Sequence, residues 1–84
     1  MSRPKKRSLT LRGHRTSVSL EDEFWDAFRE IAETQEKPIN ALAAEIDEAR
    51  GMESGLASAI RLFVLRQYKQ DQIARTASET AKFQ

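Results

Sequence analysis

The stretch Arg12–Phe28 changes its pattern of apolar residues at Leu20, and this change restricts the folds that the chain can adopt. Before Leu20 the side chains alternate between two faces, which is typical of a β-strand. The more apolar face consists of Thr16, Val18 and Leu20. The polar face consists of Arg15, Ser17 and Ser19. After Leu20 the apolar residues follow a helical period, so a strand is predicted to run directly into an amphipathic helix.

This first helix is predicted to begin at Glu21 or Asp22 and to extend to about Gln35. Three acidic residues in its first turn suit the positive end of the helix dipole. Its apolar stripe includes Phe24, Phe28 and Ile31. The stripe is expected to pack in the core rather than to form a ligand site.

Two further helices are predicted, over residues 39–49 and from about residue 55 to 69 or somewhat beyond. Pro38 suits the first turn of a helix, and Gly51 is expected to end the same helix. Ser54 is the expected N-cap of the third helix. Residues 71–84 are predicted to form a polar tail.

The predicted strand requires a partner, because an isolated strand leaves its backbone N–H and C=O groups unsatisfied. Residues 9–12 have strand-like character, but Gly13 interrupts them and indicates a bend or bulge. With no second convincing strand, the predicted partner is the same strand of a second copy, antiparallel across a twofold axis. The predicted fold class is therefore mainly α with one short N-terminal β-strand, completed in a homodimer.

The formal net charge of +1 conceals an uneven distribution of charge. Residues 1–15 hold six of the 14 Lys and Arg residues and none of the 13 acidic residues. Residues 1–8 are expected to form a disordered basic arm, and such an arm favours a polyanion such as nucleic acid. A solvated tail without a ligand is the alternative.

The composition argues against several classes of function. The chain has no cysteine and a single histidine, His14, so neither a disulfide framework nor a His/Cys metal site is expected. No nucleophile has an evident base partner and no glycine-rich phosphate loop occurs, so neither an enzyme nor a cofactor is predicted. No apolar run approaches the roughly 18 residues of a membrane span, and no secretory signal precedes the strand. A cytoplasmic protein is expected.

The order of these elements resembles the ribbon-helix-helix (Arc/MetJ-type) DNA-binding family. The resemblance is carried by residues 15–20, by the apolar stripe of the first helix, and by residues 38–42 at the start of the second. It covers roughly residues 9–68, and a bacterial subgroup with an added C-terminal helix is the nearest match. Residues 9–70 are accordingly expected to form the domain.

The resemblance implies that two paired strands enter the major groove of double-stranded DNA and contact base edges. The base-contacting residues would be Arg15, Ser17 and Ser19. The dimer ribbon and core would contain Thr16, Val18, Leu20, Phe24, Phe28 and Ile31. Phosphate contacts would come from the start of the second helix and from the basic arm, through Ile39, Asn40, Lys5, Lys6, Arg7 and Arg12.

The helix that holds the phosphate is left open by the sequence. Residues 58–68 also resemble a second helix of the family, which would make residues 38–50 an insertion and move the phosphate site to residues 54–58. The helix over residues 39–49 is favoured because the break that precedes it has the right length.

These patterns together predict a homodimeric, sequence-specific DNA-binding protein that regulates transcription. One alternative is an antitoxin-like protein whose C-terminal helix or tail binds a protein partner, since the third helix has more apolar residues than one buried face needs. Another alternative is a helical interaction module that does not bind DNA.

Overall fold

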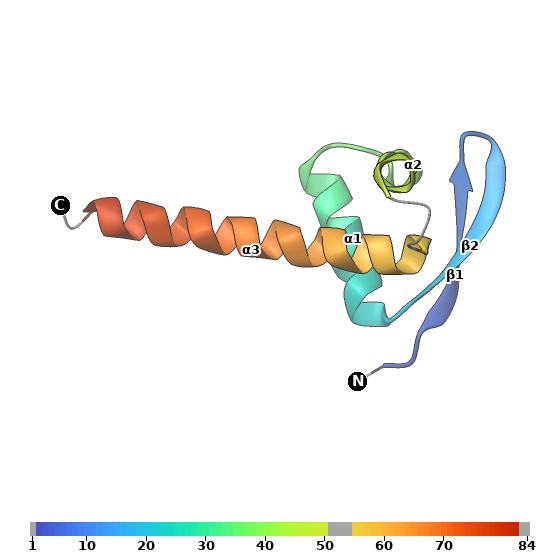
Figure 1. Cartoon of the computed structure of the whole chain (residues 1–84), viewed down its shortest axis with the longest axis horizontal. Helices are drawn as coiled ribbons and strands as arrows, with labels where there is room; N and C mark the ends of the chain where they lie inside the picture. The colour runs from blue at the N-terminus through green and yellow to red at the C-terminus, as the bar shows by residue number, and fades with distance from the viewer. Residues whose placement is uncertain (1, 51–54, 83–84) are drawn as a thin grey trace.

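The computed structural model describes residues 2–50 and 55–82, and it contains a β-hairpin followed by three helices (Figure 1). The strands are β1 (Lys5–Leu11) and β2 (His14–Leu20). The helices are α1 (Asp22–Thr34), α2 (Ile39–Ala49) and α3 (Leu56–Lys82). The predicted fold class, mainly α with a short N-terminal β-strand and a third helix, is confirmed, except that the chain has two N-terminal strands where one was predicted. Gly51 and Ser54, the expected helix end and cap, lie outside the described residues.

The strand β1 corrects the prediction that residues 1–8 form a disordered arm. It pairs antiparallel with β2, from Lys5 opposite Leu20 to Leu11 opposite His14. The ribbon is therefore formed within one chain. Because β1 supplies the partner that β2 needs, the reason given for pairing the strand with a second copy no longer applies.

The two strands are joined by a tight turn at Arg12 and Gly13. Both residues have positive φ angles, 52° and 81°. Two central residues with positive φ define a type I′ turn, whose twist matches that of the flanking strands. Gly13 thus helps to reverse the chain, where the sequence had indicated a bend or bulge within one strand.

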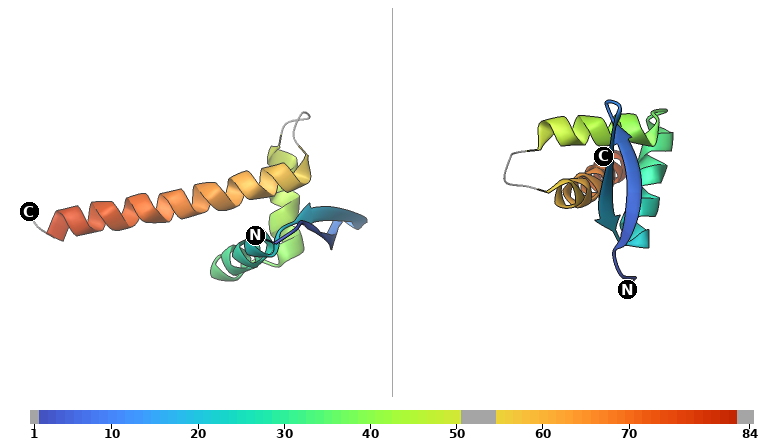
Figure 2. Two further views of the ribbon diagram at one scale, coloured as in Figure 1. Left: turned by 90° about the horizontal axis from the view of Figure 1, so that it is seen from below. Right: turned by 90° about the vertical axis from the view of Figure 1, so that its right-hand side faces the viewer.

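The inner face of the hairpin packs on the helices, with β1 against α2 and β2 against α3 (Figure 2). Leu9, Val18 and Leu20 are its buried residues. Each buried aliphatic side chain of this kind stabilises the fold by about 1.5–3 kcal/mol. The hairpin is therefore an integral part of the core.

The helices contribute the remainder of this core. Its buried residues are Ala27, Phe28 and Ala32 of α1, Leu42, Ala43 and Ile46 of α2, and Ile60 and Val64 of α3. The ring of Phe28 lies 6.3 Å from that of Trp25 and 6.4 Å, edge-on, from that of Phe63. Phe24 and Ile31, which were expected in the core, are half-buried and pack against it.

A Schellman motif ends α1. The Glu36 N–H donates to the Glu33 carbonyl and the Lys37 N–H to the Ala32 carbonyl, both at 3.0 Å. Glu36 has a φ of 56°, the left-handed conformation that usually selects glycine at this position. Pro38 follows and leads directly into α2. This motif explains the short break between the two helices.

The helix α3 is longer than predicted, because it continues to Lys82 where a polar tail was expected from residue 71. Its 27 residues span about 40 Å, and its C-terminal part extends beyond α1 and α2 (Figure 1). Residues 70–82 contain no glycine or proline and include helix-forming Ala and Gln together with one Arg, one Glu and one Lys, which accounts for the extension. Among the described residues, no helix is both long enough and apolar enough to cross a membrane.

Candidate nucleic-acid interface

The outer face of the ribbon carries six exposed polar side chains, three from each strand. The strand β2 provides Arg15, Ser17 and Ser19, and the strand β1 provides Lys6, Ser8 and Thr10. Directly opposite residues of an antiparallel pair share a face, so the six form one continuous surface. This surface holds two cationic groups, four hydroxyl groups and no carboxylate. It can donate hydrogen bonds to an anionic partner over its whole length.

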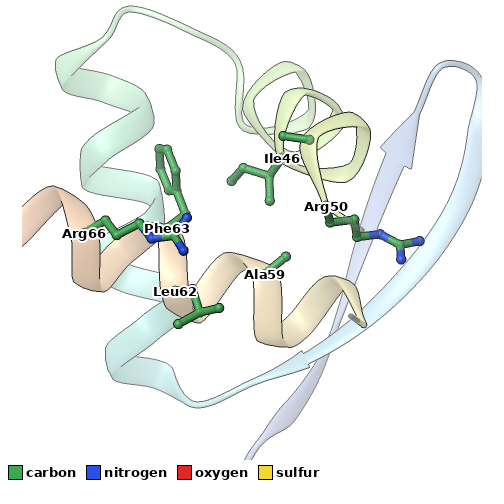
Figure 3. A pocket seen from close by; sticks show the side chains of 7 residues that line it. Ile46, Arg50, Ala59, Leu62, Phe63 and Arg66 are labelled. Carbon is green, nitrogen blue, oxygen red and sulfur yellow. The ribbon is translucent and has the colours of Figure 1, made fainter. Parts of the chain in front are cut away.

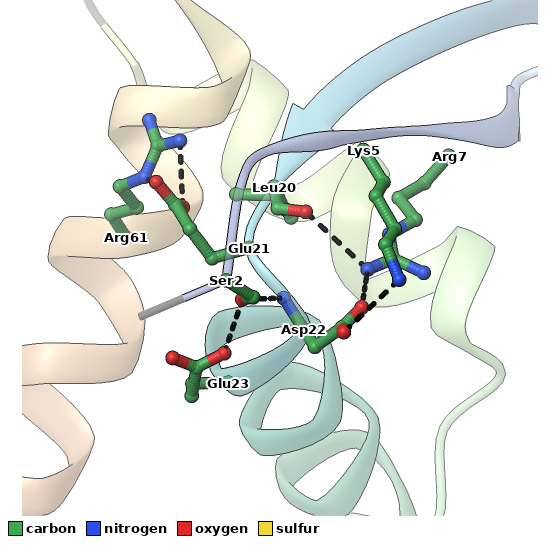
Figure 4. Close-up of polar contacts among 8 residues, drawn as sticks. All are labelled: Ser2, Lys5, Arg7, Leu20, Glu21, Asp22, Glu23 and Arg61. Atoms are coloured by element: carbon green, nitrogen blue, oxygen red, sulfur yellow. Dashed lines mark hydrogen bonds and ion pairs between the residues drawn. The ribbon is translucent and has the colours of Figure 1, made fainter.

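Arg7, one of the residues expected at a DNA phosphate, points inward instead. Its Nη2 donates to Asp22 Oδ1 at 2.5 Å and more weakly to the Leu20 carbonyl at 3.4 Å (Figure 4). The guanidinium also lies 5.4 Å from the centre of the Trp25 ring, and the side chain is 18% exposed. Arg7 therefore joins β1 to the start of α1.

Lys5 binds the same carboxylate, through Nζ at 3.1 Å from Asp22 Oδ2. Hydrogen bonds from Arg7, and then from Lys5, hold the pKa of Asp22 below its ordinary value. Ser2 adds a neighbouring contact, because its hydroxyl accepts from the Asp22 N–H at 3.1 Å and donates to the Glu23 carboxylate. These contacts of Asp22 form a first clamp, which ties the N-terminal segment to the first turn of α1.

A second clamp connects the end of β2 to α3. Arg61 donates to Glu21 Oε1 from Nε at 3.0 Å and from Nη2 at 2.9 Å (Figure 4). Its Nη2 also donates to the Ser19 carbonyl at 3.2 Å. The pKa of Glu21 is lowered, first by a backbone hydrogen bond and then by the one from Arg61. The two clamps fix the direction in which the ribbon leaves the helices.

The N-terminus of α2 lies beside β1. The Thr10 N–H donates to Asn40 Oδ1 at 3.0 Å, which places the first turn of this helix against the edge of the ribbon. The first bond within the helix joins the Leu42 N–H to the Pro38 carbonyl, so the amides of residues 39–41 precede it. This turn has no side-chain cap and no acidic residue. Such an end favours an anion.

The tip of the hairpin rests on the other end of α2, where Arg12 forms an ion pair with Glu48. A concavity of about 380 Å³ lies between this tip and the start of α3, and its lining includes His14, Arg15 and Leu56. Arg15 is therefore exposed on the ribbon and also lines a concavity that reaches the start of α3. The sequence alternative, a phosphate site at residues 54–58, falls partly outside the described residues.

A second concavity, of about 250 Å³, separates α2 from α3 (Figure 3). Its lining is Ile46, Ala49, Arg50, Ala59, Leu62, Phe63 and Arg66. The floor is apolar and carries no pair of groups suited to acid–base chemistry. Within the part of the chain that the structure describes, no three acidic or histidine side chains converge as metal ligands would.

The structure adds functional candidates that the sequence interpretation missed. Ser8 and Thr10 were not assigned a role, and Lys6 was assigned to phosphate rather than to the ribbon face. A residue pair ending in glycine, Arg12-Gly13, between two alternating stretches is a hairpin signal that could have identified β1. Arg61 had no comparable signal, because it meets Glu21 only after the chain has folded.

Comparison with known proteins adds the family. A family model described as a ribbon-helix-helix domain matches residues 4–68, which include the hairpin, α1, α2 and the first part of α3. Members of that family are typically DNA-binding transcription regulators or antitoxins; they generally dimerise and are not enzymes. No curated protein and no solved structure matched the chain.

Proposed function

Because the chain belongs to the ribbon-helix-helix family, we propose that it is a sequence-specific DNA-binding protein that regulates transcription. The observation that carries the proposal is the exposed outer face of the ribbon, with its cationic and hydroxyl groups and no carboxylate. A two-stranded ribbon fits the major groove of B-form DNA, where each base pair presents a distinct pattern of donors and acceptors. Because bacterial transcription takes place in the cytoplasm, the proposed function implies a cytoplasmic localisation.

In this function the residues of β2 contact base edges. Arg15 can donate two hydrogen bonds to O6 and N7 of one guanine. Ser17 and Ser19 are short, and their hydroxyls would donate or accept at close range or through bridging water. Val18 and Leu20, which are buried, hold these side chains outward by fixing the opposite face of the strand.

Phosphate contacts are proposed at the start of α2, through the amides of Ile39 and Asn40. Support comes from the hydrogen bond that keeps this turn against β1, and from the absence of an acidic residue in it. Lys5 and Arg12 would add charge at the rim by exchanging their carboxylate partners for phosphate. Arg7 is not proposed to contact phosphate, because its guanidinium already binds the Asp22 carboxylate and lies over the Trp25 ring.

The test is a pair of arginine variants measured against a selected duplex and a random duplex at one salt concentration. Arg15→Ala is expected to lose about 1–3 kcal/mol on the selected duplex and far less on the random one, because it removes a base contact. Arg29→Ala, on the exposed side of α1, removes the same charge and should leave both affinities nearly unchanged. Equal losses on both duplexes for Arg15→Ala would refute its role in sequence recognition.

A second candidate function, an antitoxin-like role, is favoured by apolar surface on α3. Among the residues of this helix whose burial is described, up to residue 74, the large exposed apolar side chains are Leu62 (47%), Leu65 (49%), Tyr68 (49%) and Ile73 (68%). Either a second copy of the chain or a different protein could cover this surface. Because β2 already pairs with β1, the interface of a homodimer is proposed on α3 and not between the strands of two copies. Large exposed apolar side chains that lie along one helix are a feature of protein interaction sites.

Sedimentation of the wild type and of Leu65→Ser at micromolar concentration distinguishes these occupants. A dimer that dissociates in the variant would support self-association through α3. If both samples are monomeric and still bind DNA, the exposed apolar surface of α3 is the binding site of a different protein. A dimer unaffected by Leu65→Ser and by Leu62→Ser would contradict an interface at this place.

A further inference from the structure

The two strands of the hairpin have nearly the same sequence pattern. Residues 6–11 read Lys-Arg-Ser-Leu-Thr-Leu, and residues 15–20 read Arg-Thr-Ser-Val-Ser-Leu. Position by position, both segments contain a basic residue, a polar residue, serine, an aliphatic residue, a hydroxyl residue and leucine. The offset between the segments is constant, so the hairpin is an internal repeat.

The pairing register converts this repeat into an approximate twofold axis. Ser8 lies opposite Ser17 at the centre, Lys6 lies opposite Ser19, and Thr10 lies opposite Arg15. A twofold rotation about the centre of this pairing exchanges Ser8 with Ser17, Lys6 with Arg15, and Thr10 with Ser19. Each outward side chain is therefore exchanged with one of similar chemistry. The basic residues occupy diagonally opposite corners of the face, and the four hydroxyl groups fill the space between them.

The buried face follows the same symmetry where the core requires it. Leu9 and Val18 are equivalent positions, and both are buried. Leu11 and Leu20 are likewise equivalent, being half-buried and buried respectively. The repeat thus governs both which residues pack on the helices and which face outward.

We propose that one chain carries a complete, pseudo-twofold DNA-reading ribbon, in which Lys6, Ser8 and Thr10 contact bases alongside the residues of β2. This inference rests on the proposed DNA-binding function and specifies its recognition unit. A ribbon made from two identical strands needs two chains, whereas this hairpin provides both strands from one. Lys6, expected at a phosphate, is here a second base-contacting cation.

The geometry predicts the form of the DNA element. Lys6 and Arg15 are separated by four residue steps along the ribbon, about 13 Å, which corresponds to about four base-pair steps. Each can bind a guanine. Because the approximate twofold axis exchanges the two basic residues, they contact opposite DNA strands when this axis coincides with a dyad of the duplex. The expected element is therefore near-palindromic, with a guanine towards each end. Arginine binds guanine through two hydrogen bonds in a fixed plane, so the guanine opposite Arg15 should be the more strictly required.

The experiment is a selection of bound duplexes from a random pool by the full chain and by two variants. The wild type is expected to select a near-palindromic element. The Leu65→Ser variant, in which a dimer through α3 is disrupted, should bind a duplex carrying a single copy as one chain by sedimentation. Lys6→Ala should lower discrimination at one end of the element by about 5- to 150-fold, and Arg15→Ala should do so at the other end. Lys69→Ala, an exposed lysine of α3, controls for the loss of one charge.

The possible failures are distinguishable. If Lys6→Ala weakens all duplexes equally while the wild type still selects an element, DNA binding stands and the role of Lys6 in base recognition is overturned. Two chains of the Leu65→Ser variant on a single element would overturn the one-chain ribbon in the same way. If the wild type selects no duplex and its binding does not depend on salt, the proposed function fails and this inference fails with it.

Discussion

The packing of β1 can be tested by truncating Leu9, which faces the core from the middle of the strand. Its side chain is 2% exposed and belongs to the same cluster as Leu20, Phe28 and Leu42. Leu9→Ala removes three carbon groups, worth about 2.4 kcal/mol at roughly 0.8 kcal/mol each. The cavity left behind adds to this loss, so the free energy of unfolding should fall by about 3–4 kcal/mol.

A loss of this size is large for so small a domain. A chain of 84 residues is expected to have a free energy of unfolding of about 4–13 kcal/mol. Each kcal/mol should lower the melting temperature by about 4–8 °C, so Leu9→Ala should lower it by at least about 12 °C. Urea unfolding followed by far-UV circular dichroism, with the melting temperature as a second readout, measures both quantities.

The neighbouring residue provides the control. Thr10 is exposed on the outer face, and its contact with Asn40 uses the backbone N–H, which Thr10→Ala retains. This variant should remain within about 0.5 kcal/mol of the wild type. If Leu9→Ala also stays within that margin, β1 does not pack on the helices, and residues 5–8 belong to the disordered arm that was predicted over residues 1–8.

Further predictions concern the turn, the end of α1, the acidic clamp and the contact with α2. Gly13→Ala should destabilise by about 1–2 kcal/mol in thermal unfolding, because alanine is strained at positive φ. Glu36→Gly should stabilise by about 0.5–1 kcal/mol in the same assay, since glycine tolerates the left-handed conformation at the end of α1. The pKa of Asp22 lies below its ordinary value of 3.8 because two basic side chains of β1 donate to it, so its contribution is present above about pH 4 and is lost as the pH falls through the lowered pKa. Asp22→Asn should therefore flatten the acid limb of a stability–pH curve, and an unchanged limb would exclude this clamp. Asn40→Ala should cost about 0.5–1.5 kcal/mol in urea unfolding and speed hydrogen exchange at the Thr10 amide.

Much of the helical part of the fold was predictable because its signals are local. The acidic first turn of α1, the spacing of Phe24, Phe28 and Ile31, and Pro38 before α2 each depend on neighbouring residues. The alternation in residues 15–20 likewise separated the exposed side chains of β2 from the buried ones. Local periodicity is sufficient for such assignments.

The strand β1 was not predicted because its composition is unusual for a strand. Basic residues dominate its start, and Arg7 occupies an inward position where an apolar residue would have marked a strand. The structure accounts for that arginine through Asp22 and Trp25, partners that lie 15 and 18 positions further along the chain. Contacts of this kind depend on the folded arrangement, as does the one between Arg61 and Glu21. The local pattern around them gave no indication of either.

The central claim, that one chain supplies both strands of the ribbon, can be tested with an engineered disulfide. The chain has no cysteine, so Ser8→Cys with Ser17→Cys introduces a single possible pair. These residues lie directly opposite each other. The Thr10 N–H points away from β2 towards Asn40, so the Thr10–Arg15 pair is not hydrogen-bonded, and Ser8–Ser17, two positions along, is of the same kind. Such pairs have Cα atoms about 4.5 Å apart, within the range that a disulfide spans.

The measurement is the mass and peptide map of the double variant after oxidation at low concentration, with Ser17→Cys alone as the control. A ribbon formed within one chain predicts a monomer whose two new cysteines are joined to each other, while the single variant keeps a free thiol. Disulfides that join two copies, or thiols that remain free in the double variant, would contradict the single-chain ribbon.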